Sequence, residues 1–413
     1  MSNHSNPVLP SPSAPTWQNW SGNLVHEPST NGANYYFRPT NLVELKSVLT
    51  DAVAKGVTVR VSAQRHSQPP LVTNDNRGAV SPQPTTYLVD MPCYADLGPE
   101  GKDLMVLGPG PNQVTVNPGT REDDLDAFLT KNKLMLETVT AGGFFSIGGM
   151  TAVDVHGGTV EAPIFTEAVS AFTILGADGN ETIIDRQSKD GEGHSLLQFA
   201  RVSLGGLGVV TRMTLDVLPR PWANTLQGAT EYFRLPTREE FVAKFKELLT
   251  GSTKPARLEV FFTPYAGPWW PAKNLLLLRW DVVANPNTQI PSSDATPKSA
   301  CELSHADEFG APLIDILGGK WTEALIRAAQ TTWLYTSGAA EIALFALSEI
   351  ESQAGKSGQN FSDLWLAKSS RASNCRVSTT MVLRKCGRAW TSSPIMSCKP
   401  ATSTSPLRWS SVL

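Results

Sequence analysis

The chain has 413 residues, and its 35 Lys and Arg against 38 Asp and Glu give a formal net charge of −3. This length exceeds what one ordinary core needs, so we expect two domains. Acidic and basic residues are interspersed along most of the chain, which argues against a nucleic-acid-binding face, and no apolar run reaches the length of a membrane span. Of the five cysteines, Cys93 and Cys301 stand alone and none belongs to a close metal-ligand pair. We therefore predict neither a disulfide framework nor a metal site.

Residues 1–35 form a lead-in whose first part is rich in Pro and Ser. It lacks the cationic start and apolar core of a secretory signal. We therefore expect a cytoplasmic protein, with secretion as the alternative if a signal lies upstream. Ordered structure should begin near the aromatic segment WQNWS at 17–21.

A helix should follow Pro39, because Thr40 or Asn41 can cap it and apolar residues recur at helical spacing up to Gly56. Residues 57–61 alternate as in a strand. This strand leads into the loop 62–71, where His66 stands beside two prolines. A strand end fixed by prolines suits a functional side chain, although a solvated loop histidine is the plain alternative.

Short strands at 88–90 and 114–117 should continue the mixed order, followed by a helix at 123–133 that a capping box of Thr120 and Asp123 opens. Strands at 168–175 and 182–185 should pair through a hairpin at 177–180. A further strand, within 204–218, starts on a glycine cluster, which lets a ligand approach the backbone.

Residues 141–158 read AGGFFSIGGMTAVDVHGG, a stretch whose glycines require sharp turns and close approach of the backbone. The N–H groups of such turns form anion-binding concavities, so a pyrophosphate is the natural ligand. A glycine-rich turn between two strands is the alternative.

The loop of His66, this glycine stretch and the cluster before Val209 together resemble the FAD-binding domain of the vanillyl-alcohol oxidase family, over about residues 36–219. The resemblance implies a two-subdomain FAD-binding domain, with FAD bonded covalently to His66. Where the family usually has glycine three residues before the histidine, this chain has Ala63. A Rossmann-type domain is the weaker fit, because no GxGxxG opens a helix. The cofactor-binding residues implied are Ser62, Ala63, Gln64, Arg65, His66, Ser67, Ser146, Ile147, Gly148, Gly149, His156, Gly157, Gly208, Val209 and Val210.

A second helix should span 238–249, because Thr237 and Glu240 form a capping box. The aromatic-rich segment 257–283 should form strands that could line an apolar pocket. Together with WQNWS, its sequence resembles the bacterial cholesterol oxidases with covalent FAD, in which Glu259 would be the catalytic proton acceptor. A strand-edge glutamate paired with Arg257 or Arg279 is the alternative.

Helical patterns continue at 311–330 and 336–351, but residues 366–413 contain no Asp or Glu among many basic residues. We expect this basic tail to be read from a shifted frame. A genuine arm that binds nucleic acid or membrane is the alternative. The family's Glu-x-Arg pair, which the resemblance places near the end of the substrate domain, is not found.

The sequence therefore predicts an α+β flavoprotein with a lead-in at 1–35, an FAD-binding domain at 36–219, a substrate-binding domain at 220–365 that lacks part of its family counterpart, and the atypical tail 366–413. The substrate domain should be a mixed sheet covered by helices. The expected reaction is oxidation of a 3β-hydroxysteroid with dioxygen as acceptor, giving hydrogen peroxide. A sterol would be collected by peripheral contact with a membrane. The alternatives are a sugar, alditol or aldonolactone oxidase of the same family, and a flavin-binding protein without turnover.

Overall fold

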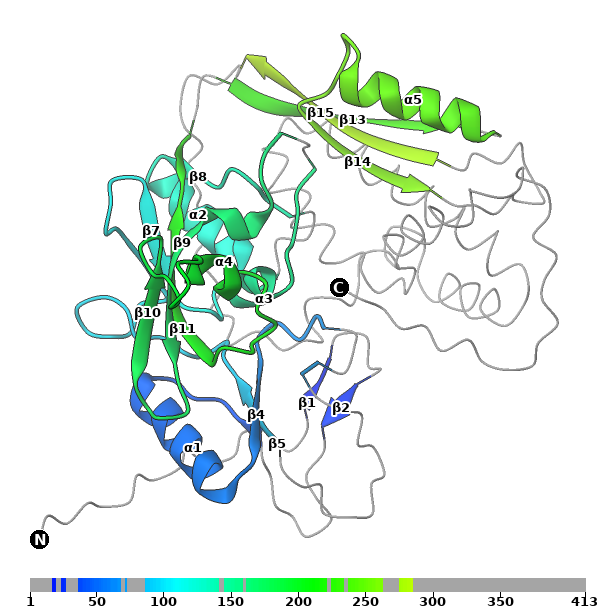
Figure 1. The fold of residues 1–413 in the computed structure, drawn as a ribbon. Helices are drawn as coiled ribbons and strands as arrows, with labels where there is room; N and C mark the ends of the chain where they lie inside the picture. The colour runs from blue at the N-terminus through cyan, green and yellow to red at the C-terminus, as the bar shows by residue number, and fades with distance from the viewer. Residues whose placement is uncertain are drawn as a thin grey trace, which may run out of the picture.

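The computed structural model describes residues 17–19, 24–26, 36–67, 71–72, 86–140, 145–158, 161–220, 224–233, 237–262 and 275–284. Within these ranges the fold is α+β, with several separate sheets (Figure 1). No helix in the described ranges combines the length and apolar character needed to cross a membrane.

A small parallel sheet comes first, with strands in the order β3 (Tyr36–Phe37), β5 (Thr86–Asp90) and β4 (Thr58–Ser62). Helix α1 (Leu42–Lys55) joins β3 to β4 and buries one face, including Leu45 and Val48, against the sheet. The predicted helix is confirmed, since the Asn41 side chain accepts a hydrogen bond from the Glu44 N–H and Gly56 ends the helix at φ 65°. The carboxyl ends of the parallel strands all face the same edge.

The larger sheet is antiparallel, in the order β10-β9-β11-β7-β6. Strand β11 alternates buried and half-buried residues along its whole length, as predicted from its period of two. The Asp178-Gly179 hairpin also forms, with Gly179 at φ 77°. The bounds of these strands are β6 Met105–Leu107, β7 Gln113–Val116, β9 Val169–Leu175, β10 Glu181–Asp185 and β11 Val209–Asp216.

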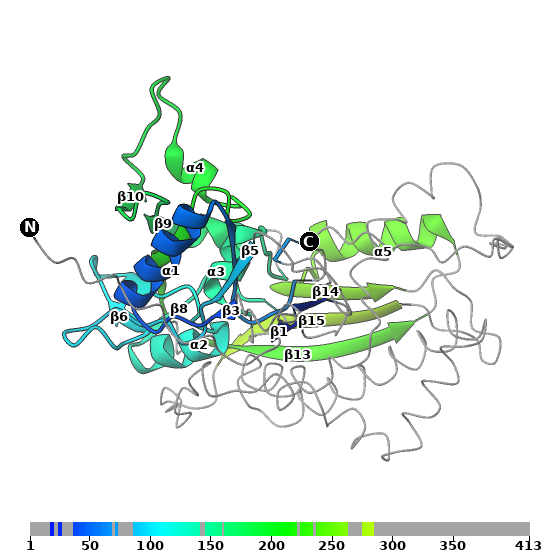
Figure 2. The same ribbon diagram turned by 90° about the horizontal axis from the view of Figure 1, so that it is seen from below.

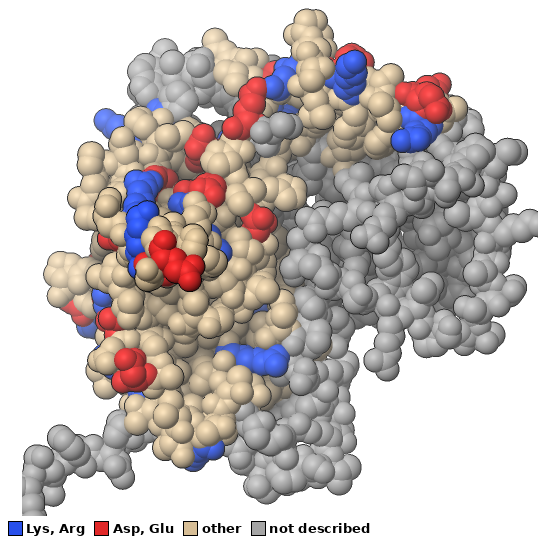
Figure 3. All heavy atoms as spheres, in the orientation of Figure 1, with Lys and Arg blue, Asp and Glu red and all other residues tan. Residues whose placement is uncertain are grey.

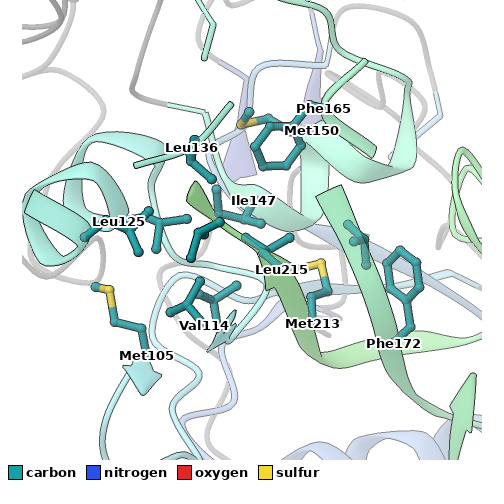
Figure 4. Close-up of a cluster of buried hydrophobic side chains, with 14 of the residues drawn as sticks. Met105, Val114, Leu125, Leu136, Ile147, Met150, Phe165, Phe172, Met213 and Leu215 are labelled. Carbon is teal, nitrogen blue, oxygen red and sulfur yellow. The ribbon is translucent and has the colours of Figure 1, made fainter. Parts of the chain in front are cut away.

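The main core lies between this sheet and the short helices that cover it (Figure 4). Leu125 of α2, Ile147 and Met150 of α3 and Phe165 of a 3-10 turn are fully or almost fully buried there. The remaining elements are α2 Glu122–Lys131, α3 Ile147–Ala152, the 3-10 turn Phe165–Ala168, α4 Leu196–Ala200, and the short strands β1 Trp17–Gln18, β2 Val25–His26, β8 Leu134–Met135 and β12 Leu218–Pro219.

The capping box predicted for α2 is wrong. Its N-cap is Arg121, and no side chain caps it. The Asp123 carboxylate binds the Arg121 guanidinium at 2.7 Å, and Thr120 donates to the Leu104 carbonyl at 3.3 Å, so neither side chain is available for the reciprocal cap. The prediction that Cys93 stands alone is also wrong, because Cys93 is disulfide-bonded; spacing along the chain does not reveal pairing between distant cysteines.

The last described unit is a three-stranded antiparallel sheet in the order β13 (Asn224–Phe233), β15 (Leu275–Ala284) and β14 (Arg257–Phe262). Helix α5 (Arg238–Thr250) lies on one face of this sheet in both views (Figures 1 and 2). Its predicted capping box of Thr237 and Glu240 is confirmed.

Three contacts join strand β14 and the turn before it to residues 137–161. The Leu258 N–H donates to the Gly158 carbonyl, Arg257 Nη2 donates to the Glu137 carbonyl at 3.3 Å, and Lys254 pairs with Glu161. Strand β14 and the turn before it therefore contact the end of the glycine stretch and residues on either side of the stretch.

Several predictions lie outside the described residues: the helices at 311–330 and 336–351, the tail 366–413, and residues 263–274 of the aromatic segment that suggested an apolar pocket.

Candidate functional site

The loop that carries His66 leaves the carboxyl end of β4, the edge where ligands bind in parallel sheets. Trp17 Nε1 donates to the Ser62 hydroxyl at 3.0 Å, and Asn19 Nδ2 donates to the Ser67 carbonyl at 2.9 Å. Trp17 and Asn19 of the WQNWS segment thus support the loop on both sides of His66, a contact that was not predicted. Residues 63–67 are all half-buried.

Positive φ in this loop falls on Arg65, at 57°, and not on Ala63. A methyl group at Ala63 is therefore compatible with the backbone, and the departure from the family's glycine does not distort this conformation.

A buried charged cluster supports the residue before His66. Asp90, the last residue of β5, is fully buried, and its Oδ2 accepts from Tyr36 Oη at 2.7 Å and from Arg65 Nη2 at 2.9 Å. Arg38 Nε lies 3.7 Å from the same oxygen. Burial, together with the negative charge of Asp90, raises the pKa of Tyr36 well above its ordinary value, so the phenol remains a donor. The sequence analysis missed Asp90 and Tyr36; an acid that closes an otherwise apolar strand was the available signal.

His66 contacts the glycine stretch directly. Its ring meets the ring of Phe145 edge-on, with centroids 4.6 Å apart and an interplanar angle of 83°. Phe145 directly precedes Ser146, so the structure brings together two of the three motifs singled out in the sequence.

Residues Ser146 to Gly149 form the N-cap and first turn of α3 rather than an open turn. Ile147 N–H donates to the Thr120 carbonyl, Gly148 N–H to the Pro118 carbonyl, and Gly149 N–H to the Ser146 hydroxyl. A pyrophosphate contact at these positions would replace one of these bonds. Gly142 and Gly143 lie outside the described residues, and the pyrophosphate assignment remains a prediction.

The third motif, the glycine cluster before Val209, and the residues leading into it contact the C-terminal end of α3. Val202 and Leu204 donate their N–H groups to the carbonyls of Thr151 and Ala152, at the end of α3. Gly208 has φ 130°, and a Cβ there would lie 2.7 Å from the Leu175 carbonyl oxygen, so only glycine fits at the start of β11. Val209 and Val210 then pair with Leu175 and Ile174 of β9.

His156 is exposed four positions beyond α3, with its Nδ1 3.1 Å from the Gly157 carbonyl. Gly157 itself is closely packed, since a Cβ there would lie 2.8 Å from the Val139 carbonyl oxygen. The predicted site residues of the FAD-binding half thus surround α3 and the carboxyl edge of the parallel sheet.

Glu259 lies in β14, where its backbone is opposite Leu278 of β15. Of the two arginines proposed as alternative partners, Arg279 binds Asp281 at 3.0 Å and Arg257 donates to the Glu137 carbonyl. The catalytic role of Glu259 remains a prediction.

A buried carboxyl holds the residue that precedes the glycine stretch. Glu122, the first residue of α2, accepts hydrogen bonds from Thr140 N–H at 2.6 Å and from the Thr140 hydroxyl. Burial raises its pKa from an ordinary value of 4.5 to about 7, an effect that Asp126 and Asp123 increase and the Thr140 bonds oppose. Arg257 of β14 is the cation that interacts with Glu122 electrostatically.

We expect Glu122→Gln to remove a pH dependence of stability. Because the pKa is raised in the folded protein, the carboxyl contributes most below pH 4.5, and its contribution falls as the pH rises to about 7. At about 1.4 kcal/mol per pKa unit, the wild type should lose about 3 kcal/mol relative to the glutamine variant between these limits. Urea unfolding of both proteins from pH 4.5 to 8 measures this difference; a difference that does not change with pH contradicts it.

In the described part of the chain, no three His, Cys, Asp or Glu side chains cluster in a way that could hold a metal ion. On the described surface shown in Figure 3, basic and acidic side chains are interspersed rather than gathered by sign.

No protein-family model matches the chain. The curated relatives it matches include L-gulono-1,4-lactone dehydrogenase of Mycobacterium tuberculosis (28% identical over 53% of this chain and 47% of the relative), L-gulonolactone oxidase of Bos taurus (30% over 45% and 37%), and mitochondrial L-galactono-1,4-lactone dehydrogenase of Arabidopsis thaliana (27% over 60% and 35%). They support the predicted class, a flavin-dependent oxidoreductase with FAD. The match thus covers less than half the length of each of these relatives.

These names agree with the aldonolactone alternative rather than with the main prediction. Neither the closeness to cholesterol oxidases nor the sterol substrate is supported, because the relatives are named for sugar lactones. Among solved structures, a xylooligosaccharide oxidase from Myceliophthora thermophila in complex with xylobiose is similar with a TM-score of 0.46 and 14% identity, over 64% of this chain and 50% of that one. Likeness at this level does not establish a shared fold.

Proposed function

We propose that the chain is an FAD-dependent oxidoreductase that oxidises a secondary hydroxyl group of an aldono-1,4-lactone. The named activities of the curated relatives support the substrate class. The contact between His66 and Phe145 is the structural observation that carries the proposal, because it joins the histidine loop to the glycine stretch.

The residues around His66 fit a heteroaromatic cofactor with nitrogen and oxygen atoms along its edge. Gln64 Nε2 is buried without a hydrogen-bond partner among the described residues, and it could donate to an acceptor on the edge of such a ring. His66 would hold the ring, and its edge contact with Phe145 places it at the glycine stretch. FAD bound there would supply a two-electron acceptor.

Converting CH–OH to C=O releases two electrons and two protons. Dioxygen that accepts them becomes hydrogen peroxide, and a dehydrogenase would pass them to another acceptor. Glu259 is the residue proposed to take the hydroxyl proton, because a carboxylate is a suitable general base. The central part of the aromatic segment that favoured a sterol, residues 263–274, lies outside the described residues, and the segment does not decide the substrate.

The test compares peroxide release, and separately reduction of an artificial dye, with four substrates: L-gulono-1,4-lactone, D-arabinono-1,4-lactone, cholesterol and an alditol. We expect turnover with a lactone and none with cholesterol or without substrate. Protein that carries flavin but turns over no lactone with either acceptor contradicts the substrate proposal. Protein that carries no flavin, and takes none up when FAD is added, contradicts the cofactor.

A further inference from the structure

The carboxyl edge of the parallel sheet brings four chain segments to one point. Asp90 ends β5 and is the direct strand neighbour of Ser62, which ends β4. Tyr36 comes from β3, and Arg65 comes from the loop three residues after Ser62. This arrangement depends on the parallel pairing of the three strands and not on a local turn.

One carboxylate oxygen organises the cluster. Tyr36 Oη and Arg65 Nη2 both donate to Asp90 Oδ2, and Arg65 Nη2 also lies 2.7 Å from Tyr36 Oη, which closes a triangle of polar contacts. The Arg65 guanidinium carbon is 5.9 Å from the centre of the Tyr36 ring. Charge-assisted bonds to a buried carboxylate are stronger than neutral ones, so the position of the arginine is firmly fixed.

The arginine so held is the residue whose backbone is left-handed. A non-glycine residue at φ 57° is energetically unfavourable, so its surroundings must offset the cost. The bonds to Asp90 and Tyr36 are the interactions that offset it. Because His66 follows directly, the direction in which its ring leaves the backbone depends on Arg65 remaining in this conformation.

We propose that Asp90, Arg65 and Tyr36 are positioning residues that orient the His66 imidazole for covalent attachment of the flavin. The inference rests on the proposed function, because it assumes that FAD binds here. Attachment exchanges one hydrogen of the flavin 8α-methyl group for an imidazole nitrogen. That hydrogen and the imidazole N–H hydrogen leave as two protons and two electrons, which dioxygen takes up as hydrogen peroxide.

The test uses the full chain, produced in flavin-starved cells and then given FAD. Total bound flavin is read from absorbance, and attached flavin from the share retained by acid-precipitated protein over time. We expect Asp90→Asn to bind FAD but to attach it about 100-fold more slowly than the wild type, the cost of a misplacement of about 1 Å. Tyr36→Phe, which removes one hydroxyl group and keeps the ion pair, should show a smaller slowing.

The matched control is Asp126→Asn, which disrupts another buried ion pair, that of Asp126 with Arg220 at 2.9 Å. It should attach FAD at the wild-type rate. If Asp90→Asn does not fold, Tyr36→Phe decides alone.

Attachment at the wild-type rate in either folded variant overturns the positioning role and leaves the proposed function standing. The positioning role is also overturned, with the proposed function left standing, if the wild type binds FAD but never attaches it. An Asp126→Asn variant that attaches FAD as slowly as Asp90→Asn has the same consequence. A wild type that binds no FAD overturns both proposals.

Discussion

Replacing His66 with alanine should move all of the flavin colour from acid-precipitated protein into the supernatant, while the wild type keeps its colour in the pellet. The reason is that His66 is the histidine in ring contact with Phe145 at the glycine stretch, and only a nucleophilic side chain can retain flavin after unfolding. Native His66→Ala should still bind FAD reversibly, because the contacts from the other loops remain.

His194→Ala is the control for this result. His194 is exposed and pairs with Asp190 on the surface, so its loss should leave the colour in the pellet. Because His156 also lies next to a predicted site glycine, it is the alternative point of attachment. Retained colour in His66→Ala and lost colour in His156→Ala would transfer the attachment to His156.

Replacing Phe165 with alanine should destabilise the protein by about 3 to 5 kcal/mol. Phe165 is fully buried in the core beside Met150 (Figure 4), and truncating it leaves a cavity that rigid neighbours cannot fill. A loss of this size is a large part of the about 5 to 15 kcal/mol that stabilises a typical domain. Equilibrium unfolding in urea, followed by fluorescence and circular dichroism, measures it.

Phe199→Ala is the matched control, since the Phe199 side chain is 61% exposed. Its effect should stay within about 0.5 kcal/mol. Equal losses in the two variants would show that the core around α3 is not packed as described. The Phe165 N–H also donates to the Val155 carbonyl at 2.8 Å, so the backbone next to His156 depends on the same residue.

Elements with strong local signals were predictable from the sequence. Helices α1 and α5 carry their caps in the sequence, at Asn41 and Thr237, and both were predicted to within a residue or two of their bounds. Strand β11 was predictable from its alternation. In each case the deciding interactions lie within a few residues along the chain.

Elements without such signals were missed. Helix α3 is 6 residues long and contains two glycines, which favour a turn when judged locally; packing of Ile147 and Met150 into the core stabilises it as a helix. Strand β13 was also missed, because Gly228 and its small and polar neighbours interrupt the alternating pattern, and pairing with β15 compensates.

At the candidate site, His66 and Gly208 could be singled out from the sequence, because a histidine in a loop at a strand end and a glycine cluster before a strand are local features; their role in binding stays a prediction. The cluster of Asp90, Arg65 and Tyr36 was not predictable, because these residues come from two strands and a loop that only the folded sheet brings together. The named relatives favour the aldonolactone alternative over the predicted sterol, since aromatic residues in a sequence indicate apolar surface but not which molecule it faces.

The junction of Leu258 with Gly158 is a main-chain hydrogen bond, and Gly158 permits it because a side chain there would come within 3.1 Å of the Leu258 carbonyl oxygen. This junction requires a backbone N–H at position 258, which every residue except proline has, and no side chain at position 158. The Leu258 side chain can therefore be exchanged without loss of the hydrogen bond that aligns β14 with residues 137–158.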